Sequence, residues 1–153
     1  MRSSFLSLSL LVFTLCGCSS DDDNTGGNNT AGTHKIVMQI EGSENISYIF
    51  AFAGASTSGS AARLYDKQKE YQGNTYSETG VLTGKSTEFI CYTSEDGLLM
   101  TLALSLSSTQ VGAKVTYSLK AYINDKLVDE LQKTATFTEN NVTETVSFST
   151  TSL

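Results

Sequence analysis

The sequence of 153 residues contains no proline, no tryptophan and a single histidine. One histidine, His34, cannot by itself hold a metal ion, and the sequence has no C-x-x-C, no H-E-x-x-H and no glycine-rich phosphate loop. Without proline, the exposed edges of any sheet must be protected by charge or by bulges. We therefore expect no metal, no cofactor and no enzymatic activity.

The chain also lacks a cluster of positive charge. Lys and Arg together number 10 against 16 Asp and Glu, so that the formal net charge is −6. The basic side chains are scattered, and a negative balance of this kind argues against nucleic acid or an anionic membrane surface as a partner. The length is that of one domain with a single hydrophobic core.

Apolar runs long enough to cross a bilayer are missing as well. The run over residues 5–15 follows Arg2 and is shorter than the roughly 20 residues of a membrane-spanning helix, which is typical of a secretory signal. The block Leu15-Cys16-Gly17-Cys18 at its end resembles the lipobox of bacterial lipoproteins. The resemblance implies a signal peptide over residues 1–17 and a diacylglycerol on the sulfur of Cys18, which anchors the protein in the outer membrane. The alternative is ordinary secretion with cleavage after Ser19.

An acidic block follows this cysteine directly. Ser20, Asp21, Asp22 and Asp23 resemble the export signal of surface lipoproteins of the Bacteroidota, which implies a protein that faces the exterior of the cell. The alternative is a solvated acidic tether on a protein that faces the periplasm. Residues 18–33 contain no large apolar side chain, and this composition predicts a flexible linker before a domain over residues 34–153.

Only one cysteine, Cys91, remains if residues 1–17 are removed and Cys18 carries lipid. A disulfide is then impossible, and the apolar neighbours of Cys91 predict that its thiol is buried. A nucleophilic cysteine needs a nearby base, and we expect His34 to be solvated at the entrance of the domain.

Apolar side chains recur with period two from residue 35 onward, which predicts strands. The inward rows are Ile36, Met38 and Ile40; Ile46, Tyr48, Phe50 and Phe52; Val115, Tyr117, Leu119, Ala121 and Ile123; and Val146 with Phe148. The second of these strands is apolar on both faces, so we expect it to lie centrally and to be covered on both sides. The last strand, interrupted by Glu144, is expected at an edge. Residues 61–84, broken by glycines, predict edge strands and long loops.

Two hairpins are expected. Asp96-Gly97 suits a type I′ turn, and taking these residues as the loop pairs Thr93 with Met100, Cys91 with Leu102 and Phe89 with Leu104. A second connection lies near residue 124. A two-residue turn there would place Leu119 opposite Glu130, whereas a three-residue loop over residues 124–126 matches Leu119 with Leu131, and we expect the latter.

These patterns predict an all-β domain, a two-sheet antiparallel immunoglobulin-like sandwich of about seven or eight strands. A small closed β-barrel with a lipid-sized cavity is the alternative, because alternation does not separate the two.

Seven tyrosines are the remaining functional signal. The alternation assigns Tyr48 and Tyr117 to the core, and leaves as candidate ligand-facing aromatics Tyr65, Tyr71, Tyr76, Tyr92 and Tyr122. The alternative is that these are ordinary strand residues with hydroxyls in water.

The sequence as a whole predicts a lipid-anchored, non-catalytic binding protein at the cell surface, with an extracellular glycan or protein as its partner. Two alternatives are a structural or assembly subunit of an envelope or fimbria-like complex, marked by an unpaired edge strand that accepts a donor strand, and a carrier of a small apolar ligand.

Overall fold

A computed structural model describes residues 30–151, and none of these residues lies in a helix. It therefore contains no helix long and apolar enough to cross a membrane in this part of the chain. The strands are β1 (His34–Gly42), β2 (Ser47–Ser56), β3 (Leu64–Tyr65), β4 (Tyr71–Gly73), β5 (Thr75–Val81), β6 (Thr87–Thr93), β7 (Gly97–Ser108), β8 (Lys114–Ile123), β9 (Lys126–Thr136) and β10 (Val142–Ser149).

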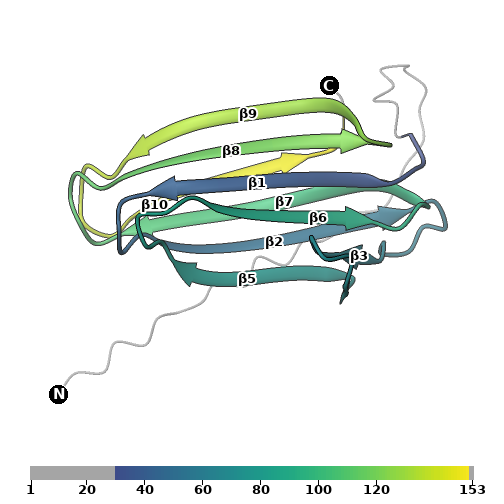
Figure 1. The fold of residues 1–153 in the computed structure, drawn as a ribbon, viewed down its shortest axis with the longest axis horizontal. Coiled ribbons are helices and arrows are strands. Elements are labelled where there is room, and N and C mark those ends of the chain that lie inside the picture. The colour runs from purple at the N-terminus through teal and green to yellow at the C-terminus, as the bar shows by residue number, and fades with distance from the viewer. Residues whose placement is uncertain (1–29, 152–153) are drawn as a thin grey trace, which may run out of the picture.

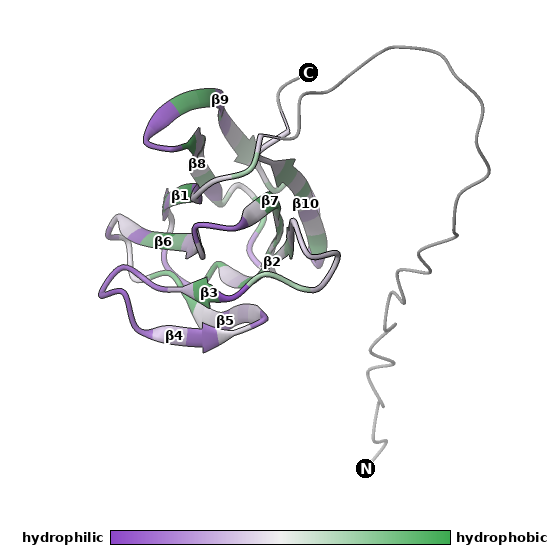
Figure 2. Cartoon of the chain, turned by 90° about the vertical axis from the view of Figure 1, so that its right-hand side faces the viewer, coloured by the Kyte–Doolittle hydropathy of each residue, from purple (hydrophilic) through white to green (hydrophobic). Residues whose placement is uncertain are grey.

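The strands form two antiparallel sheets that pack face to face (Figure 1). One sheet has the order β4-β3-β6-β1-β8-β9 and the other has the order β10-β7-β2-β5. The two sheets contact each other at β4 and β5, and their ribbons lie farther apart at β9 and β10 (Figure 2), where the side chains of Lys133 and Glu144 connect them. The predicted sandwich is thus confirmed, and the closed barrel is excluded because the strands divide into two sheets with free edges. Ten strands replace the expected seven or eight, because residues 61–84 contribute three short ones, two of them edge strands as expected.

The core lies between the two sheets. The predicted inward residues of β1 and β8 are all buried, as are Phe50, Phe52 and Phe148. Tyr117 is fully buried, whereas Tyr48 is half-buried and packs against the core. The alternation therefore predicted correctly which side of each of these strands faces inward, because only one side of a sandwich strand can bury apolar surface.

The predicted hairpin around Asp96 and Gly97 is wrong. β6 pairs with β1 and β3 in one sheet, and β7 pairs with β2 and β10 in the other, so this turn crosses from sheet to sheet. The apolar residues expected to pair across the turn are nevertheless all buried. Two strands that turn their apolar side chains into the same core show the same sequence pattern whether they pair in one sheet or face each other from two sheets. The alternation therefore could not distinguish a hairpin from a crossing between the sheets.

Gly97 is needed for space and not for backbone conformation. Neither Asp96 nor Gly97 has a positive φ, which excludes the type I′ turn. A Cβ at Gly97 would lie 2.7 Å from the carbonyl oxygen of Gly32 and closer still to Thr93 Oγ1. The chain entering β1 and the turn before β7 therefore meet at this glycine, where the Gly32 N–H donates to the Gly97 carbonyl at 2.9 Å.

β2 is central in its sheet, as expected, between β7 and β5. The expectation that it is covered on both sides is wrong, because Ile49 on its outer face is 49% exposed. The outer face of β2 is apolar because it carries small side chains and one isoleucine that are in contact with water. Its apolar character does not indicate a third layer.

The register of β8 and β9 is confirmed, but the loop is different. Leu119 lies opposite Leu131, as predicted from the matching of apolar residues. The turn nevertheless consists of two residues, Asn124 and Asp125, with φ values of 49° and 63°, and Ile123 pairs with Lys126. A shift of the register between Ala121 and Tyr122 reconciles the predicted pairing with the shorter turn, because a bulge in β9 supplies the one extra residue.

β10 is an edge strand, as predicted, and Glu144 is the polar side chain that leaves one end of this strand in contact with water. The Glu144 carboxylate accepts hydrogen bonds from the Tyr117 hydroxyl at 2.8 Å and from Lys133 Nζ at 2.6 Å. These bonds connect β10 of one sheet with β8 and β9 of the other. They also hold the pKa of Glu144 below its usual value, the Lys133 bond being the larger cause.

Candidate functional site

Four tyrosines form a row across the outer face of the six-stranded sheet. Tyr71 of β4 lies opposite Tyr65 of β3, Tyr65 lies opposite Tyr92 of β6, and Lys35 of β1 lies between Tyr92 and Tyr122 of β8. We call Tyr71, Tyr65, Tyr92 and Tyr122 the tyrosine row. Tyr65, Tyr92 and Tyr122 each follow a residue that is buried in the core, namely Leu64, Cys91 and Ala121, and alternation therefore turns these three tyrosines outward.

The rings of the tyrosine row contact one another or the ammonium groups of Lys35 and Lys69. The Tyr65 and Tyr71 ring centroids lie 5.8 Å apart, and Tyr71 is 59% exposed. Lys35 Nζ lies 4.2 Å from the Tyr122 centroid and 6.0 Å from that of Tyr92. Lys69, on the turn before β4, places its Nζ 3.1 Å from the Tyr92 centroid. The row is therefore an alternation of aromatic faces and cations, each cation held by the negative face of a ring.

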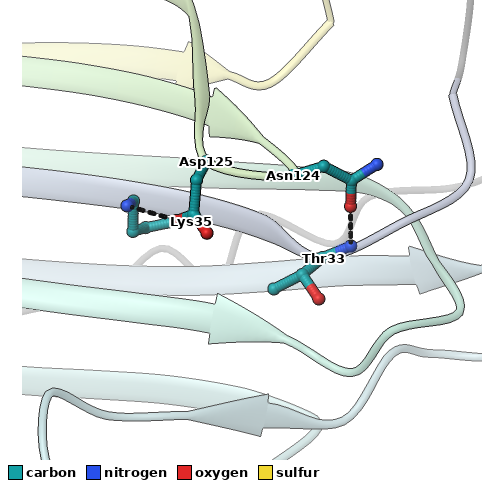
Figure 3. Close-up of polar contacts among 4 residues, drawn as sticks. All are labelled: Thr33, Lys35, Asn124 and Asp125. Atoms are coloured by element: carbon teal, nitrogen blue, oxygen red, sulfur yellow. Dashed lines mark hydrogen bonds and ion pairs between the residues drawn. The ribbon is translucent and has the colours of Figure 1, made fainter.

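The tip of the β8–β9 hairpin contacts Thr33 and Lys35 at the start of β1 (Figure 3). Asp125 Oδ1 accepts a hydrogen bond from Lys35 Nζ at 2.9 Å, and this bond holds the pKa of Asp125 below its usual value. The neighbouring Asn124 Oδ1 accepts from the Thr33 N–H at 3.0 Å. The hairpin tip thus fixes Lys35 between the two rings and ties the start of β1 to the site.

Two open clefts adjoin Tyr65. The larger, of about 540 Å³, has a lining that includes Tyr65, Lys69, Tyr92, Ser94, Glu95 and Asp96. The smaller, of about 300 Å³, is lined by Ser56, Ser60, Arg63 and Tyr65. Both present hydroxyl, carboxylate and cationic groups beside an aromatic ring. This mixture is suited to a polar ligand with a flat apolar face.

The structure brings together four of the five tyrosines predicted to face a ligand. Tyr76 is the exception, and that prediction is wrong. Its ring stacks on Phe52 at 5.8 Å and meets Phe50 edge-on at 5.6 Å, so it packs at the margin of the core. The reason is its position on β5, where it lies opposite Phe52 and shares the inner side of that sheet.

The prediction of a solvated His34 is also wrong. The side chain is 1% exposed, and its Nδ1 lies 2.6 Å from Thr150 Oγ1 while Nε2 lies 3.0 Å from the Thr30 carbonyl oxygen. Desolvation lowers the pKa of His34. The histidine connects Thr30 at the start of the described residues with Thr150 near their end. It lies on the inner side of the sheet, away from the tyrosine row.

Cys91 is buried, as predicted, and burial raises the pKa of its thiol to about 12. The thiol is therefore protonated at neutral pH. No group of three or more metal-binding side chains occurs within residues 30–151. Cys18 and the block Ser20, Asp21, Asp22 and Asp23 lie outside the described residues.

Sequence reasoning missed Lys35, Lys69 and Asp125. Alternation places Lys35 on the outer face, but its neighbours come from strands that are distant in the chain. Lys35 and Tyr92 pair across β1 and β6, and Lys35 and Tyr122 pair across β1 and β8. The order of the strands was the missing information.

The two packed sheets define the chain as an all-β sandwich domain. A DUF4425 family protein from Bacteroides ovatus ATCC 8483 has a crystal structure that is 36% identical, with a TM-score of 0.69 over 81% of this chain and 99% of that one. A second crystal structure, of a domain of unknown function, DUF4425, from Bacteroides vulgatus ATCC 8482, is 34% identical, with a TM-score of 0.66 over 80% of this chain and 97% of that one. The chain therefore belongs to the DUF4425 family.

Comparisons with protein-family models and with curated proteins found no match. The solved relatives correspond to about four fifths of this chain, which is the share that the strand-bearing body occupies. All ten strands lie within residues 34–149, so a chain that begins at residue 19 contains them.

Proposed function

We propose that this protein is a lipid-anchored, non-catalytic binding protein of the cell surface that holds an extracellular glycan on its tyrosine row. The single observation that carries the proposal is the alignment of four tyrosines and Lys35 across five neighbouring strands. Such an arrangement places four aromatic rings at one level of the sheet, with Tyr71 exposed and the other three half-buried. A contiguous group of aromatic rings on a protein surface is a candidate binding site.

The geometry favours a linear oligosaccharide over a single sugar. Neighbouring strands lie about 4.8 Å apart, so a row from β4 to β8 is about 19 Å long. In the adjoining clefts the hydroxyls can donate hydrogen bonds to sugar hydroxyls and accept from them, the carboxylates can accept from them, and the Lys35 ammonium can donate to them. Lys69 covers one face of Tyr92 and is exposed on a turn, so a ligand displaces it at a cost of about 0.5–1 kcal/mol.

The proposal is tested with the body beginning at residue 19, on an array of linear glycans and then by affinity electrophoresis. We expect retention of at least one glycan and loss of that retention in the triple variant Tyr65→Ala, Tyr92→Ala, Tyr122→Ala. At roughly 1 kcal/mol for each stacked ring, the dissociation constant rises about 100-fold. The matched control is Val111→Ala, which removes an exposed apolar side chain from the turn between β7 and β8 and leaves affinity unchanged.

Two outcomes contradict the proposal. Equal retention of the triple variant and the wild type would show that the tyrosine row is not the site. A glycan recovered in shortened form after incubation would show that the protein is catalytic. Thermal unfolding of both variants establishes that each is folded before its affinity is interpreted.

A further inference from the structure

The outer face of the four-stranded sheet carries no charged side chain. The registers of β10, β7, β2 and β5 place sixteen side chains on it in four rows, and eleven of them are Ser or Thr. The remaining five are Ala51, Ala53, Ala103, Ile49 and Val81. All sixteen are exposed or half-buried.

The other sheet shows that this composition is particular to one face. Its outer side carries Lys35, Glu41, Glu88, Lys120 and Glu130 in addition to the tyrosine row. The chain as a whole has a formal net charge of −6. The absence of charge from one complete sheet face therefore distinguishes that face from the rest of the described surface.

We infer that this face, which we call the hydroxyl face, is an interface between two copies of this chain. Identical copies of a negatively charged protein repel each other, and the hydroxyl face is where two copies can meet without placing like charges together. A two-fold interface brings identical patches together, so its groups must be self-complementary. Ser and Thr hydroxyls both donate and accept hydrogen bonds, and thus satisfy this condition, whereas Lys and Glu do not.

The apolar groups of the face support the same occupant. Ile49 is 49% exposed in the middle of the face and Val81 is 54% exposed at its edge. Ala51 and Ala103 are direct neighbours, so the centre of the face is low and permits a second sheet to approach closely. Packing of two such faces removes both apolar side chains from water in each copy.

The size of the face indicates a weak interaction. Four strands about 4.8 Å apart, each with seven residues at about 3.4 Å per residue, cover about 450 Å². Two copies together therefore bury about 900 Å², which is below the roughly 1,200–2,000 Å² of stable interfaces. We expect a reversible dimer with a dissociation constant on the order of 100 μM.

Sedimentation equilibrium of the body beginning at residue 19, from about 10 μM to about 1 mM, tests the inference. The wild type is expected to change from monomer to dimer over this range. Ala103→Glu and Ala103→Lys place a charge of either sign at the centre of the face, and each is expected to raise the dissociation constant at least tenfold. Gln132→Glu adds the same negative charge to the other sheet and leaves the dissociation constant unchanged.

Two results would overturn the inference. One is a wild type that remains monomeric at the highest concentration, which would leave the face to a partner other than a second copy. The other is a dimer that both Ala103 variants form as readily as the wild type. Because the two variants change the net charge in opposite directions, a shared loss of dimer reports on the face and not on overall repulsion, and their thermal midpoints show that the fold is retained.

Discussion

At the scale of the residue, His34 illustrates how a polar side chain is accommodated in the core. Its Nε2 lies near the Thr30 carbonyl oxygen, which only accepts, so Nε2 carries the proton and Nδ1 accepts from the Thr150 hydroxyl. Thr150 Oγ1 in turn accepts from the Met100 N–H at 2.9 Å. Both ring nitrogens are thus satisfied in the neutral form, which is the form that burial favours.

This arrangement predicts a loss of stability in mild acid. The pKa of His34 in the folded protein is below the unfolded value of 6.5, because burial penalises the charged ring. The unfolded state therefore binds more protons, and the stability contributed by the neutral ring is complete above pH 6.5 and is lost as the pH falls towards the lower folded pKa. Thermal unfolding between pH 8 and pH 5 is expected to show a falling midpoint.

The variant His34→Gln supplies the control, because glutamine donates and accepts hydrogen bonds without titrating. Its midpoint is expected to be lower overall but nearly flat over the same range. Equal slopes in the two proteins would assign the acid sensitivity to other groups. Glu144 does not confuse the result, since its pKa is held below 4.5 and its contribution is lost only at more acid pH.

At the scale of the element, the β8–β9 hairpin does more than connect two strands. Asn124 has a φ of 49°, its side chain accepts the Thr33 N–H, and its own N–H donates to the Thr33 carbonyl at 2.9 Å. Asp125 holds Lys35. The turn therefore joins the edge of the six-stranded sheet to the entrance of β1 and supports the tyrosine row.

Two substitutions at Asn124 separate these contributions. Asn124→Ala removes the side-chain hydrogen bond and places a Cβ residue without a local polar group at positive φ, so we expect a loss of about 1–2 kcal/mol in unfolding free energy. Asn124→Gly removes the same hydrogen bond, but glycine adopts a positive φ without strain. We expect it to lose about half as much unfolding free energy as the alanine variant. Urea denaturation measures both values. A larger loss for glycine than for alanine would show that the positive φ is not a significant cost.

At the scale of the whole molecule, the proposed anchor decides where the body works. Cys18→Ser removes the proposed acceptor of the lipid, and we expect the protein to move from the membrane fraction to the soluble fraction on cell fractionation. The physical reason is that each buried CH₂ of an acyl chain contributes about 0.8 kcal/mol, so the membrane affinity is lost with the chains. An unmodified N-terminus in the wild type, found by mass spectrometry, would contradict the anchor.

The acidic block is tested separately by protease treatment of intact cells. We expect the wild type to be cleaved and the variant with alanine at Asp21, Asp22 and Asp23 to be protected. The variant should remain in the membrane fraction, which distinguishes a failure of surface export from a failure of lipidation. Equal protection of both proteins would favour the orientation towards the periplasm.

The sequence by itself determined which side of most strands faces the core, that Cys91 is buried and that β10 is an edge strand. Period-two alternation contains this information because each strand of a sandwich has one apolar side, whatever its neighbours are. Tyr92 and Tyr122 could thus be placed on the outer side before the strand order was known, and Leu119 could be matched with Leu131.

Only the tertiary structure decided which strands are neighbours. The turn at Asp96 and Gly97 crosses between the sheets, and the same partition of strands assembles the tyrosine row and the hydroxyl face from segments distant in the chain. It also encloses His34 between residues from both ends of the body. The physical reason is that the buried side of a strand follows from its own alternation, whereas the backbone hydrogen bonds that join strands are alike for all residues and do not identify the partner strand.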